Sequence, residues 1–269
     1  SNIGEVDNKG IELSLNWRKE IIKDLNVDLR ANLTYNKNKY VYYDEPNYEA
    51  VWKKKTGQPL SISWGYIADG YFQNQEEIDN GPDQTGLGSQ LKPGDIKYRD
   101  VNGDGIINDD DKVMLSSFGS MPRIQYGLGL NLTYKKIDFG VFFNGSAQRK
   151  IMINNAMTDF GERNNNVMKC IADDHWSIDN PNPEATFPRL GLKSTDIKNN
   201  TEASSHWLRN GNFIRFKTLE VGYSFPHCRV YFSGDNLAVW SPFKLWDPEL
   251  SWNTYPLQRT FNFGVQLNF

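Results

Sequence analysis

The sequence lacks the long apolar run that a membrane-spanning helix requires. Such a helix needs about 20 consecutive, predominantly apolar residues, and no stretch of the 269 residues approaches that length. Only 38% of the residues are hydrophobic, whereas aromatic residues reach 13%. A strand that crosses a membrane needs an apolar side chain only at every second position, since alternate side chains face opposite sides. The composition therefore disfavours a helical membrane protein and is compatible with one that crosses with strands.

The sequence also has few cysteines and little net charge. Cys170 and Cys228 are the only cysteines, one in a predicted loop and one in a predicted strand, so no disulfide framework is indicated. The net charge of -3 gives no basic footprint of the kind that nucleic-acid-binding proteins carry. We therefore expect no nucleic-acid partner.

Candidate catalytic groups are few, because the chain has only three histidines. Asp173, Asp174 and His175 are adjacent, and His206 follows Ser204 and Ser205. Both groups lie in polar stretches, where such neighbours are common by chance, and neither has the spacing of a recognisable catalytic constellation. We predict that the chain is not an enzyme and has no catalytic residues.

Strict alternation of apolar and polar residues is the strongest pattern that is present. A soluble antiparallel sandwich also alternates, but its strands average about 5–6 residues, and several segments here approach the 9–11 residues that a tilted strand needs to cross a bilayer. The pattern predicts an all-β fold, an antiparallel transmembrane β-barrel. The apolar sets are Ile11, Leu13, Leu15 and Trp17; Val27, Leu29, Ala31, Leu33 and Tyr35; Tyr126, Leu128, Leu130, Leu132 and Tyr134; Ile137, Phe139, Val141 and Phe143; Leu219, Val221, Tyr223 and Phe225; Val230 and Phe232; and Phe261, Phe263, Val265, Leu267 and Phe269.

Short and long connections separate these segments in turn. The short ones are Lys135-Lys136, Pro226-His227 and residues 19–26, and the long ones are residues 37–125, 145–212 and 237–259. Outer-membrane barrels show this asymmetry, with short periplasmic turns and long extracellular loops. The final segment, Thr260 to Phe269, is then the closing strand and ends at the periplasmic side. About seven strands are predicted, whereas single-chain bacterial barrels have an even number, so we expect residues 1–269 to be the C-terminal portion of a barrel domain whose N-terminal plug and earlier strands are absent.

One loop has the spacing of a calcium-binding loop. Residues 100–111 read Asp-Val-Asn-Gly-Asp-Gly-Ile-Ile-Asn-Asp-Asp-Asp, which fits the twelve-residue EF-hand pattern with a glycine at the sixth position, Gly105. An acidic turn without metal is the alternative, and the final aspartate replaces the usual, longer glutamate. We predict a structural Ca²⁺ ion in an extracellular loop, with oxygen ligands from Asp100, Asn102, Asp104, the backbone carbonyl of Ile106, and Asp111.

Many large aromatic residues fall outside the predicted strands. They would serve either as stacking platforms for sugars or another protein, or as cores and girdles of the loops themselves, and for any single residue the second interpretation is favoured. They are Trp52, Trp64, Tyr66, Tyr71, Phe72, Trp176, Trp207, Trp240, Trp246 and Trp252.

Several short motifs, taken in order, resemble those of SusC/RagA-type TonB-dependent transporters of Bacteroidetes. The resemblance extends over nearly the whole chain. It rests on Gly4–Leu13, Ala68–Phe72, Pro93–Tyr98 leading into the loop at 100–111, Asn212–Leu219 leading to Gly222-Tyr223, Asp235–Leu237, Asp247–Glu249, Tyr255-Pro256 and the closing Phe269.

This resemblance implies a 22-stranded barrel in the cell outer membrane, surrounded by outer-membrane lipid and filled by an N-terminal plug. It further implies TonB as the energy source, acting through the missing N-terminal part, a SusD-like surface lipoprotein as partner, and import of oligosaccharides, with peptides as the other substrate class. The alternative is a secreted calcium-dependent carbohydrate-binding or docking module. A dockerin-like module needs a second copy of the calcium loop, and the sequence contains none.

Overall fold

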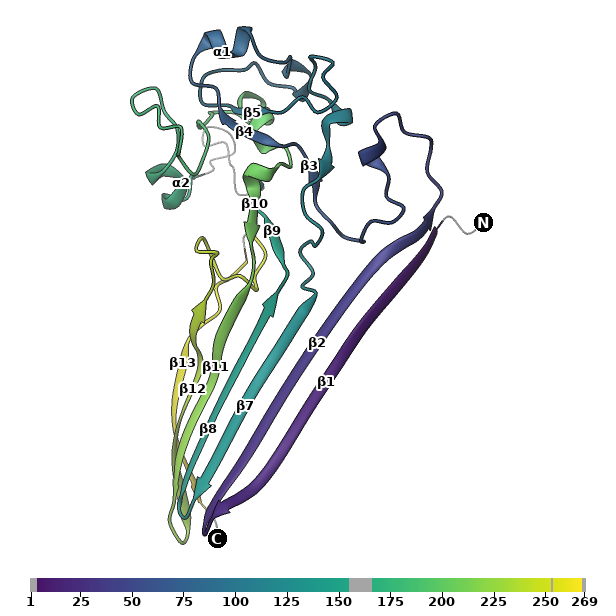
Figure 1. The fold of residues 1–269 in the computed structure, drawn as a ribbon. Coiled ribbons are helices and arrows are strands. Elements are labelled where there is room, and N and C mark those ends of the chain that lie inside the picture. The colour runs from purple at the N-terminus through teal and green to yellow at the C-terminus, as the bar shows by residue number, and fades with distance from the viewer. Residues whose placement is uncertain (1–3, 155–165, 253, 268–269) are drawn as a thin grey trace. The chain divides into compact units, whose positions relative to one another are not determined.

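One large sheet and a set of structured loops make up the computed structural model, which describes residues 4–154, 166–252 and 254–267 (Figure 1). The chain divides into two compact units. The sheet unit comprises Asp7–Asn38, Met121–Lys150 and Asn210–Phe269, and the loop unit comprises Ser1–Val6, Lys39–Ser120 and Ile151–Arg209.

Seven strands form the sheet in the order in which they occur in the chain. They are β1 (Gly4–Ile22), β2 (Leu25–Tyr43), β7 (Ile124–Tyr134), β8 (Ile137–Ala147), β11 (Phe213–Ser224), β12 (Cys228–Trp240) and β13 (Thr260–Leu267). The pairing from β2 through β13 is antiparallel. Every alternating segment in the sequence therefore corresponds to a strand, which confirms the predicted all-β antiparallel sheet.

Several strands are longer than the predicted ones, and the first hairpin shows the largest difference. β1 and β2 each have 19 residues and are joined by a turn at Lys23-Asp24, so the first hairpin is longer and tighter than alternation alone indicated. Backbone pairing continues where the side-chain pattern has become irregular, because the hydrogen bonds do not depend on side-chain polarity. At the other end, β13 is described as far as Leu267, and the predicted Phe269 lies outside the described residues.

In the part of the chain that the structure describes, the sheet is open. Its two edges are β1 and β13, each paired on one side only. The antiparallel sheet is therefore confirmed, whereas its closure into a barrel stays a prediction.

A β-bulge in β11 keeps the apolar residues of that strand on one face. The apolar sequence pattern changes phase between Phe216 and Leu219, and both pairings of β11 shift register between Phe216 and Thr218. The extra residue is Lys217, whose Nζ donates to Oδ1 of Asn236 at 3.1 Å. An inserted residue reverses the facing of all that follow, so the bulge returns Leu219 and Val221 to the same face as Phe216.

The loop unit consists of short elements. Its strand pairs are β3 (Trp64–Gly65) with β6 (Val113–Met114), β4 (Ala68–Tyr71) with β5 (Ile96–Tyr98), and β9 (Lys150–Met152) with β10 (Leu208–Asn210). Its helices are α1 (Gln75–Asp79), α2 (Lys169–Asp173) and the 3₁₀ turns η1 (Val51–Lys53), η2 (Thr85–Leu87), η3 (Asp109–Asp111), η5 (Ser194–Asp196), η6 (Lys198–Thr201) and η7 (Ser205–Trp207). Across residues 4–154, 166–252 and 254–267, no helix has the length and apolarity needed to span a membrane.

The loop unit nevertheless has a hydrophobic core. Its largest fully buried side chains are Tyr66, Phe72, Ile96, Tyr98, Ile107, Ile153, Ile171, Phe187, Ile197 and Trp207. Aromatic rings make up much of this core, and they contribute large buried areas from short segments. The loops are thus held by their own packing.

Polar side chains complete this core where the backbone of β5 has no strand beside it. Oε1 of Gln84 accepts from the Tyr98 amide at 2.7 Å, and its Nε2 donates to the Ile96 carbonyl at 3.1 Å. Nδ2 of Asn199 donates to the same carbonyl at 3.0 Å, and Oδ1 of Asn200 accepts from the Ile96 amide at 2.9 Å. Because a buried backbone group without a partner costs about 1–3 kcal/mol, these three side chains act as a substitute strand.

Two glycines of the loop unit with similar backbone angles give a matched pair of substitutions. Gly94 has φ +89° and Gly57 has φ +87°, but a Cβ on Gly94 would lie 2.1 Å from Cε3 of Trp176, whereas one on Gly57 meets nothing within 4 Å. We expect Gly57→Ala to destabilise the protein by about 1 kcal/mol through its positive φ alone. Gly94→Ala should cost about 2–4 kcal/mol, because overpacking adds to the strain. Thermal unfolding of both variants measures the difference, and equal losses would contradict the packing of Trp176 on Gly94.

Candidate functional site

Alternation gives the sheet two chemically different faces. Directly paired residues share a face, and the registers align Leu130 with Val141 and Val141 with Leu219 on one side, and Asn131 with Gly140 and Gly140 with Glu220 on the other. The apolar side is not covered by the loop residues of its own unit: Phe263 is 88% exposed and Val265 65% exposed. A large exposed apolar surface of this kind marks an interaction site or a membrane contact.

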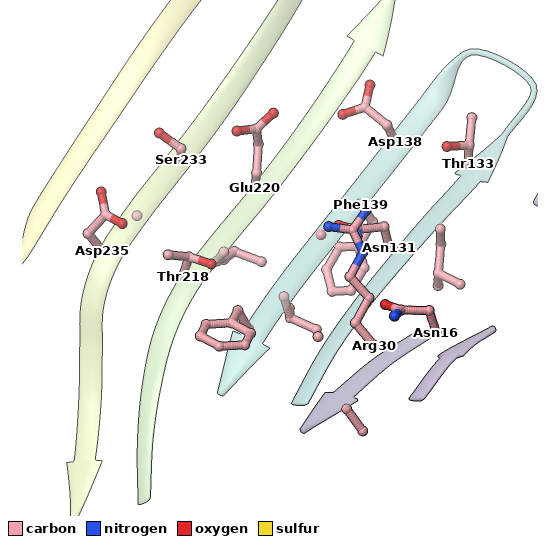
Figure 2. Close-up of a pocket in the computed structure, with 18 of the residues that line it drawn as sticks. Asn16, Arg30, Asn131, Thr133, Asp138, Phe139, Thr218, Glu220, Ser233 and Asp235 are labelled. Carbon is pink, nitrogen blue, oxygen red and sulfur yellow. The ribbon is translucent and has the colours of Figure 1, made fainter. Parts of the chain in front are cut away.

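The opposite side carries a groove of about 680 Å³, called the polar groove here. It extends across strands β1 to β12, and Figure 2 shows its carboxylates on three neighbouring strands. The labelled polar side chains that line it are Asn16, Arg30, Asn131, Thr133, Asp138, Thr218, Glu220, Ser233 and Asp235. Its volume lies within the range of about 300–1,000 Å³ typical of ligand sites.

An ion cluster borders the groove toward the short turns. Arg229 on β12 contacts Asp138 on β8 through two nitrogens, with Nε to Oδ1 at 3.0 Å, and its Nη2 lies 2.5 Å from Oε1 of Glu220 on β11. Gly222 lies between these strands, and a Cβ there would approach Asp138 Oδ1 to 2.6 Å. Glycine at position 222 thus leaves space for the guanidinium of Arg229, which connects β8, β11 and β12.

The groove offers hydrogen-bonding groups rather than reactive ones. Its side chains provide carboxylates, amides and hydroxyls together with the guanidinium of Arg30, a set that combines donors and acceptors. Such a surface suits a hydrated, polar ligand that contacts it at many points. Alternation in the sequence identified these positions as the polar face, but it gave no signal that they enclose a groove.

The predicted calcium loop is folded as a compact series of turns. Gly103 and Gly105 have φ of 77° and 82°, so Gly105 adopts the left-handed conformation of the sharp turn that the sixth position of an EF-hand loop requires. Oδ1 of Asp100 accepts from the Gly103 amide at 2.6 Å and its Oδ2 from the Gly105 amide at 2.7 Å. These contacts shape the loop in advance of any ion.

The remaining predicted ligands also bond to groups of the loop. Nδ2 of Asn102 donates to Asp104 Oδ2 at 2.9 Å, and Asp104 Oδ1 accepts from the Ile106 amide at 2.8 Å. Asp111 is fully buried and accepts from the amides of Val101 and Asn108 at 2.7 and 2.9 Å. Within the described ranges, no three His, Cys, Asp or Glu side chains gather in a way that could hold a metal ion. A carboxylate has about four acceptor positions, so the amide contacts leave room for a cation, and the calcium assignment stays a prediction.

Half of the ten aromatic residues predicted to lie in loops are buried packing residues. Tyr66, Tyr71, Phe72, Trp176 and Trp207 are buried, as favoured for each residue individually. Trp52 instead lies at the surface, and its Nε1 donates to the carbonyl of Asp110 at 2.9 Å. The sequence predicts Trp240 in a loop, but in the structure it is the last residue of β12.

Residues of the two candidate catalytic groups around His175 and His206 contact backbone groups. His175 Nδ1 lies 3.2 and 3.0 Å from the carbonyl oxygens of Ile171 and Ala172 at the end of α2. Ser205 Oγ accepts from the Ala68 amide at 2.9 Å. These contacts connect the side chains to backbone groups rather than to one another, so the geometry does not assemble an acid–base pair from them.

His206 lies between two aromatic rings of the loop unit. Its ring is 4.5 Å from that of Trp207 and 5.4 Å from that of Tyr71, centroid to centroid, and its Nε2 lies 3.3 Å from the Tyr71 hydroxyl. Burial, with a smaller effect from the nearby Arg209 cation, lowers the pKa of His206 from 6.5 to about 4. The folded protein therefore holds this imidazole neutral.

Curated proteins with similar sequences are TonB-dependent receptors. The chain is 30% identical over 303 residues to TonB-dependent receptor P26 of Formosa agariphila, matching 100% of this chain and 30% of the receptor. It is 28% identical over 292 residues to the TonB-dependent receptor SusC of Bacteroides thetaiotaomicron, matching 100% of this chain and 27% of SusC. The chain thus spans less than a third of the length of these relatives. No family model matches it.

Solved structures of the RagAB peptide transporter have a similar fold. One superposes with a TM-score of 0.66 and 22% identity over 100% of this chain and 30% of the solved chain. The RagAB peptide importer in its open-open state gives a TM-score of 0.68 with 20% identity over 99% of this chain and 29% of the other. At these identities the likeness concerns the fold.

Acidification should destabilise the loop unit through His206. Its unfolded pKa is 6.5 and its folded pKa about 4, so the unfolded state binds a proton that the folded state refuses. The contribution of neutral His206 to the free energy of unfolding is therefore fully present above pH 6.5. It is lost as the pH decreases toward 4, and the loss is at most about 3 kcal/mol. Thermal unfolding between pH 7.5 and 4 measures this loss. His206→Phe should remove that part of the pH dependence, and an unchanged profile in the variant would refute the assignment.

Proposed function

We propose that this chain, which matches SusC/RagA-type TonB-dependent receptors along its whole length, forms strands and loops of a transporter that imports oligosaccharides. The observation that carries the proposal is the alignment of the entire chain with such receptors. The match confirms the family resemblance and the outer-membrane location, and it agrees with the expectation that the chain is not an enzyme.

The two faces of the sheet support a role in transport. In the proposed barrel the apolar side faces lipid and the polar groove faces the lumen, as the alternation of transmembrane barrel strands requires. Closure with further strands would satisfy the free backbone groups of β1 and β13, since open edges are not tolerated in the hydrocarbon region. A cargo crossing the lumen would exchange hydrogen bonds with Asn131, Thr218 and Ser233.

The proposed cargo is an oligosaccharide, and a peptide is the alternative. The hydroxyl, amide and carboxylate groups of the polar groove match the many hydroxyls of a sugar. The solved structures of similar fold are of a peptide transporter, which supports testing both classes. A SusD-like surface lipoprotein would cover the loop side, and TonB would supply energy through parts of the protein outside this chain.

The loop at 100–111 is proposed to hold a structural Ca²⁺ ion. Asp100, Asn102, Asp104, the carbonyl of Ile106 and Asp111 would bind it, and the ion would neutralise the carboxylates and stiffen the loop. The second half of this loop is already anchored, since Lys53 Nζ lies 2.5 Å from Oδ1 of Asp110. The ion's role is therefore to fix the first half of the loop relative to the second.

Loss of the complete protein should abolish uptake of its cargo. Deleting its gene in the native host is expected to stop growth on an oligosaccharide as sole carbon source. Growth assays over a panel of oligosaccharides and peptides identify the compound that is imported. A tagged copy should be recovered in the outer-membrane fraction together with a surface lipoprotein. Recovery in the soluble fraction would contradict the proposal, and a growth defect confined to peptides would replace oligosaccharide by peptide as the cargo.

Removing one proposed ligand should weaken calcium binding. Asp104→Asn in the purified protein is expected to lower Ca²⁺ affinity at least about tenfold, because a carboxylate ligand becomes a neutral amide. Asp109→Asn is the matched control, since Asp109 lies in the same loop but pairs with Lys112 at 2.7 Å. Calorimetry with Ca²⁺ measures both variants. Equal affinities, or a melting temperature insensitive to chelator, would remove the metal assignment.

A further inference from the structure

The apolar face of the sheet contains a hollow of about 510 Å³ near the short turns, called the apolar hollow here. It extends from the first residue of β8, Ile137, across β11 and β12 to β13. Figure 1 shows these strands as neighbours at the end of the sheet where the β7–β8 and β11–β12 turns lie. The hollow is a feature of the surface that the proposed function places against lipid, and the inference below rests on that function.

Strand register explains why this part of the surface is hollow. Val230 pairs with Tyr223 on one side and with Val265 on the other. In the next row Val221 pairs with Phe232, which pairs with Phe263. The short side chains of Val221, Val230 and Val265 thus form the bottom of the hollow. The longer aromatic side chains beside them extend further from the sheet.

Tyr223 lines the apolar hollow at its turn end, and Phe232 and Phe263 line it on the other side. Tyr223 and Phe225 have ring centroids 4.7 Å apart at the turn end, and Phe232 and Phe263 have centroids 5.1 Å apart on the other side. Ring pairs at these separations support one another. The rings that line the hollow are therefore more rigid than isolated aliphatic side chains would be, and they leave a channel over Val221, Val230 and Val265.

Positive charge borders the hollow at its turn end. Lys136 directly precedes Ile137, and Nζ of Lys135 lies 5.1 Å from the ring centroid of Tyr134. Among the residues that the structure describes, neither lysine makes an ion pair with a carboxylate. The nearby turn holds Asp24, whose carbonyl accepts from the Lys135 amide at 3.1 Å, and Lys23 precedes Asp24. These turns thus carry three lysines against one aspartate.

We propose that the apolar hollow binds one acyl chain of an anionic phospholipid whose headgroup contacts Lys135 and Lys136. The lining is almost wholly apolar, so a sugar or peptide would leave its polar groups without partners there. An acyl chain needs no such partners, and basic residues next to an apolar surface attract anionic headgroups. A hollow with both features fits a phospholipid of the leaflet that the short turns face.

The test uses the complete transporter, purified in detergent and analysed by native mass spectrometry with phosphatidylglycerol or phosphatidylethanolamine. One phosphatidylglycerol per protein is expected to remain bound, with about thirtyfold preference over phosphatidylethanolamine, since two lysines at about 1 kcal/mol each contribute about 2 kcal/mol near a charged headgroup. Val230→Trp should fill the channel and abolish retention. Leu128→Trp, on the same face at β7, is the matched control and should retain the lipid.

A second pair of variants tests the headgroup separately. The double variant Lys135→Gln and Lys136→Gln should lose the preference for phosphatidylglycerol but keep acyl-chain binding, whereas Lys23→Gln should keep both. Folding of each variant is checked by comparing its gel migration with and without heating. If Val230→Trp does not fold, Val265→Phe takes its place.

The proposal is overturned if Val230→Trp and Leu128→Trp retain lipid equally, or if the wild type shows no preference between the two lipids. Either result in a protein that still fractionates with the outer membrane overturns the lipid site alone. Failure of that fractionation would instead count against the proposed function.

Discussion

Lateral hydrogen bonding between consecutive antiparallel strands is the constraint on which the sheet unit depends. It satisfies the backbone groups between the seven strands without help from side chains, and among these strands it leaves only the outer edges of β1 and β13 unpaired. The same pairing fixes which residues share a face, and a slip of one position would exchange the two faces. The bulge at Lys217 shows this constraint acting locally. Without the bulge, Phe216 and Val221, which are five positions apart, would point to opposite sides of β11.

Backbone groups that no paired strand satisfies rely on side chains instead. In the loop unit, Gln84, Asn199 and Asn200 bond to both backbone groups of Ile96, and Asp95 connects this network to Arg189. In the sheet unit, the buried Arg215 binds Asp247 and Glu249 at 2.6 and 2.7 Å and so holds the segment after β12. Breaking a buried ion pair of this kind costs about 3–5 kcal/mol, because it leaves an uncompensated charge. Long loops are ordered here by a few polar anchors and a small aromatic core.

The sequence predicted the sheet far better than it predicted the loops. Alternation is a repeated signal with a fixed period, so seven strands and their polar sides could be identified from it. The core of the loop unit has no period, because its members come from short turns at irregular spacing. Asp95, Asn199 and Asn200 look like ordinary polar loop residues in the sequence, yet all three are fully buried. For the calcium loop, spacing predicted the turn at Gly105, but the preference of the carboxylates for nearby amides depends on coordinates that spacing does not contain.

The polar groove and the apolar hollow arise from alternate residues of the same strands. On β11, Glu220 and Gly222 face the groove side, and Val221 and Tyr223 between them face the hollow. In both places a small residue creates the space. Gly222 leaves room for the Arg229 side chain on the polar face, and the short side chain of Val230 leaves the apolar hollow open on the other face. A substitution at one position therefore changes one face and leaves the backbone pairing of the other intact. An insertion or deletion within the strand exchanges the faces and damages both.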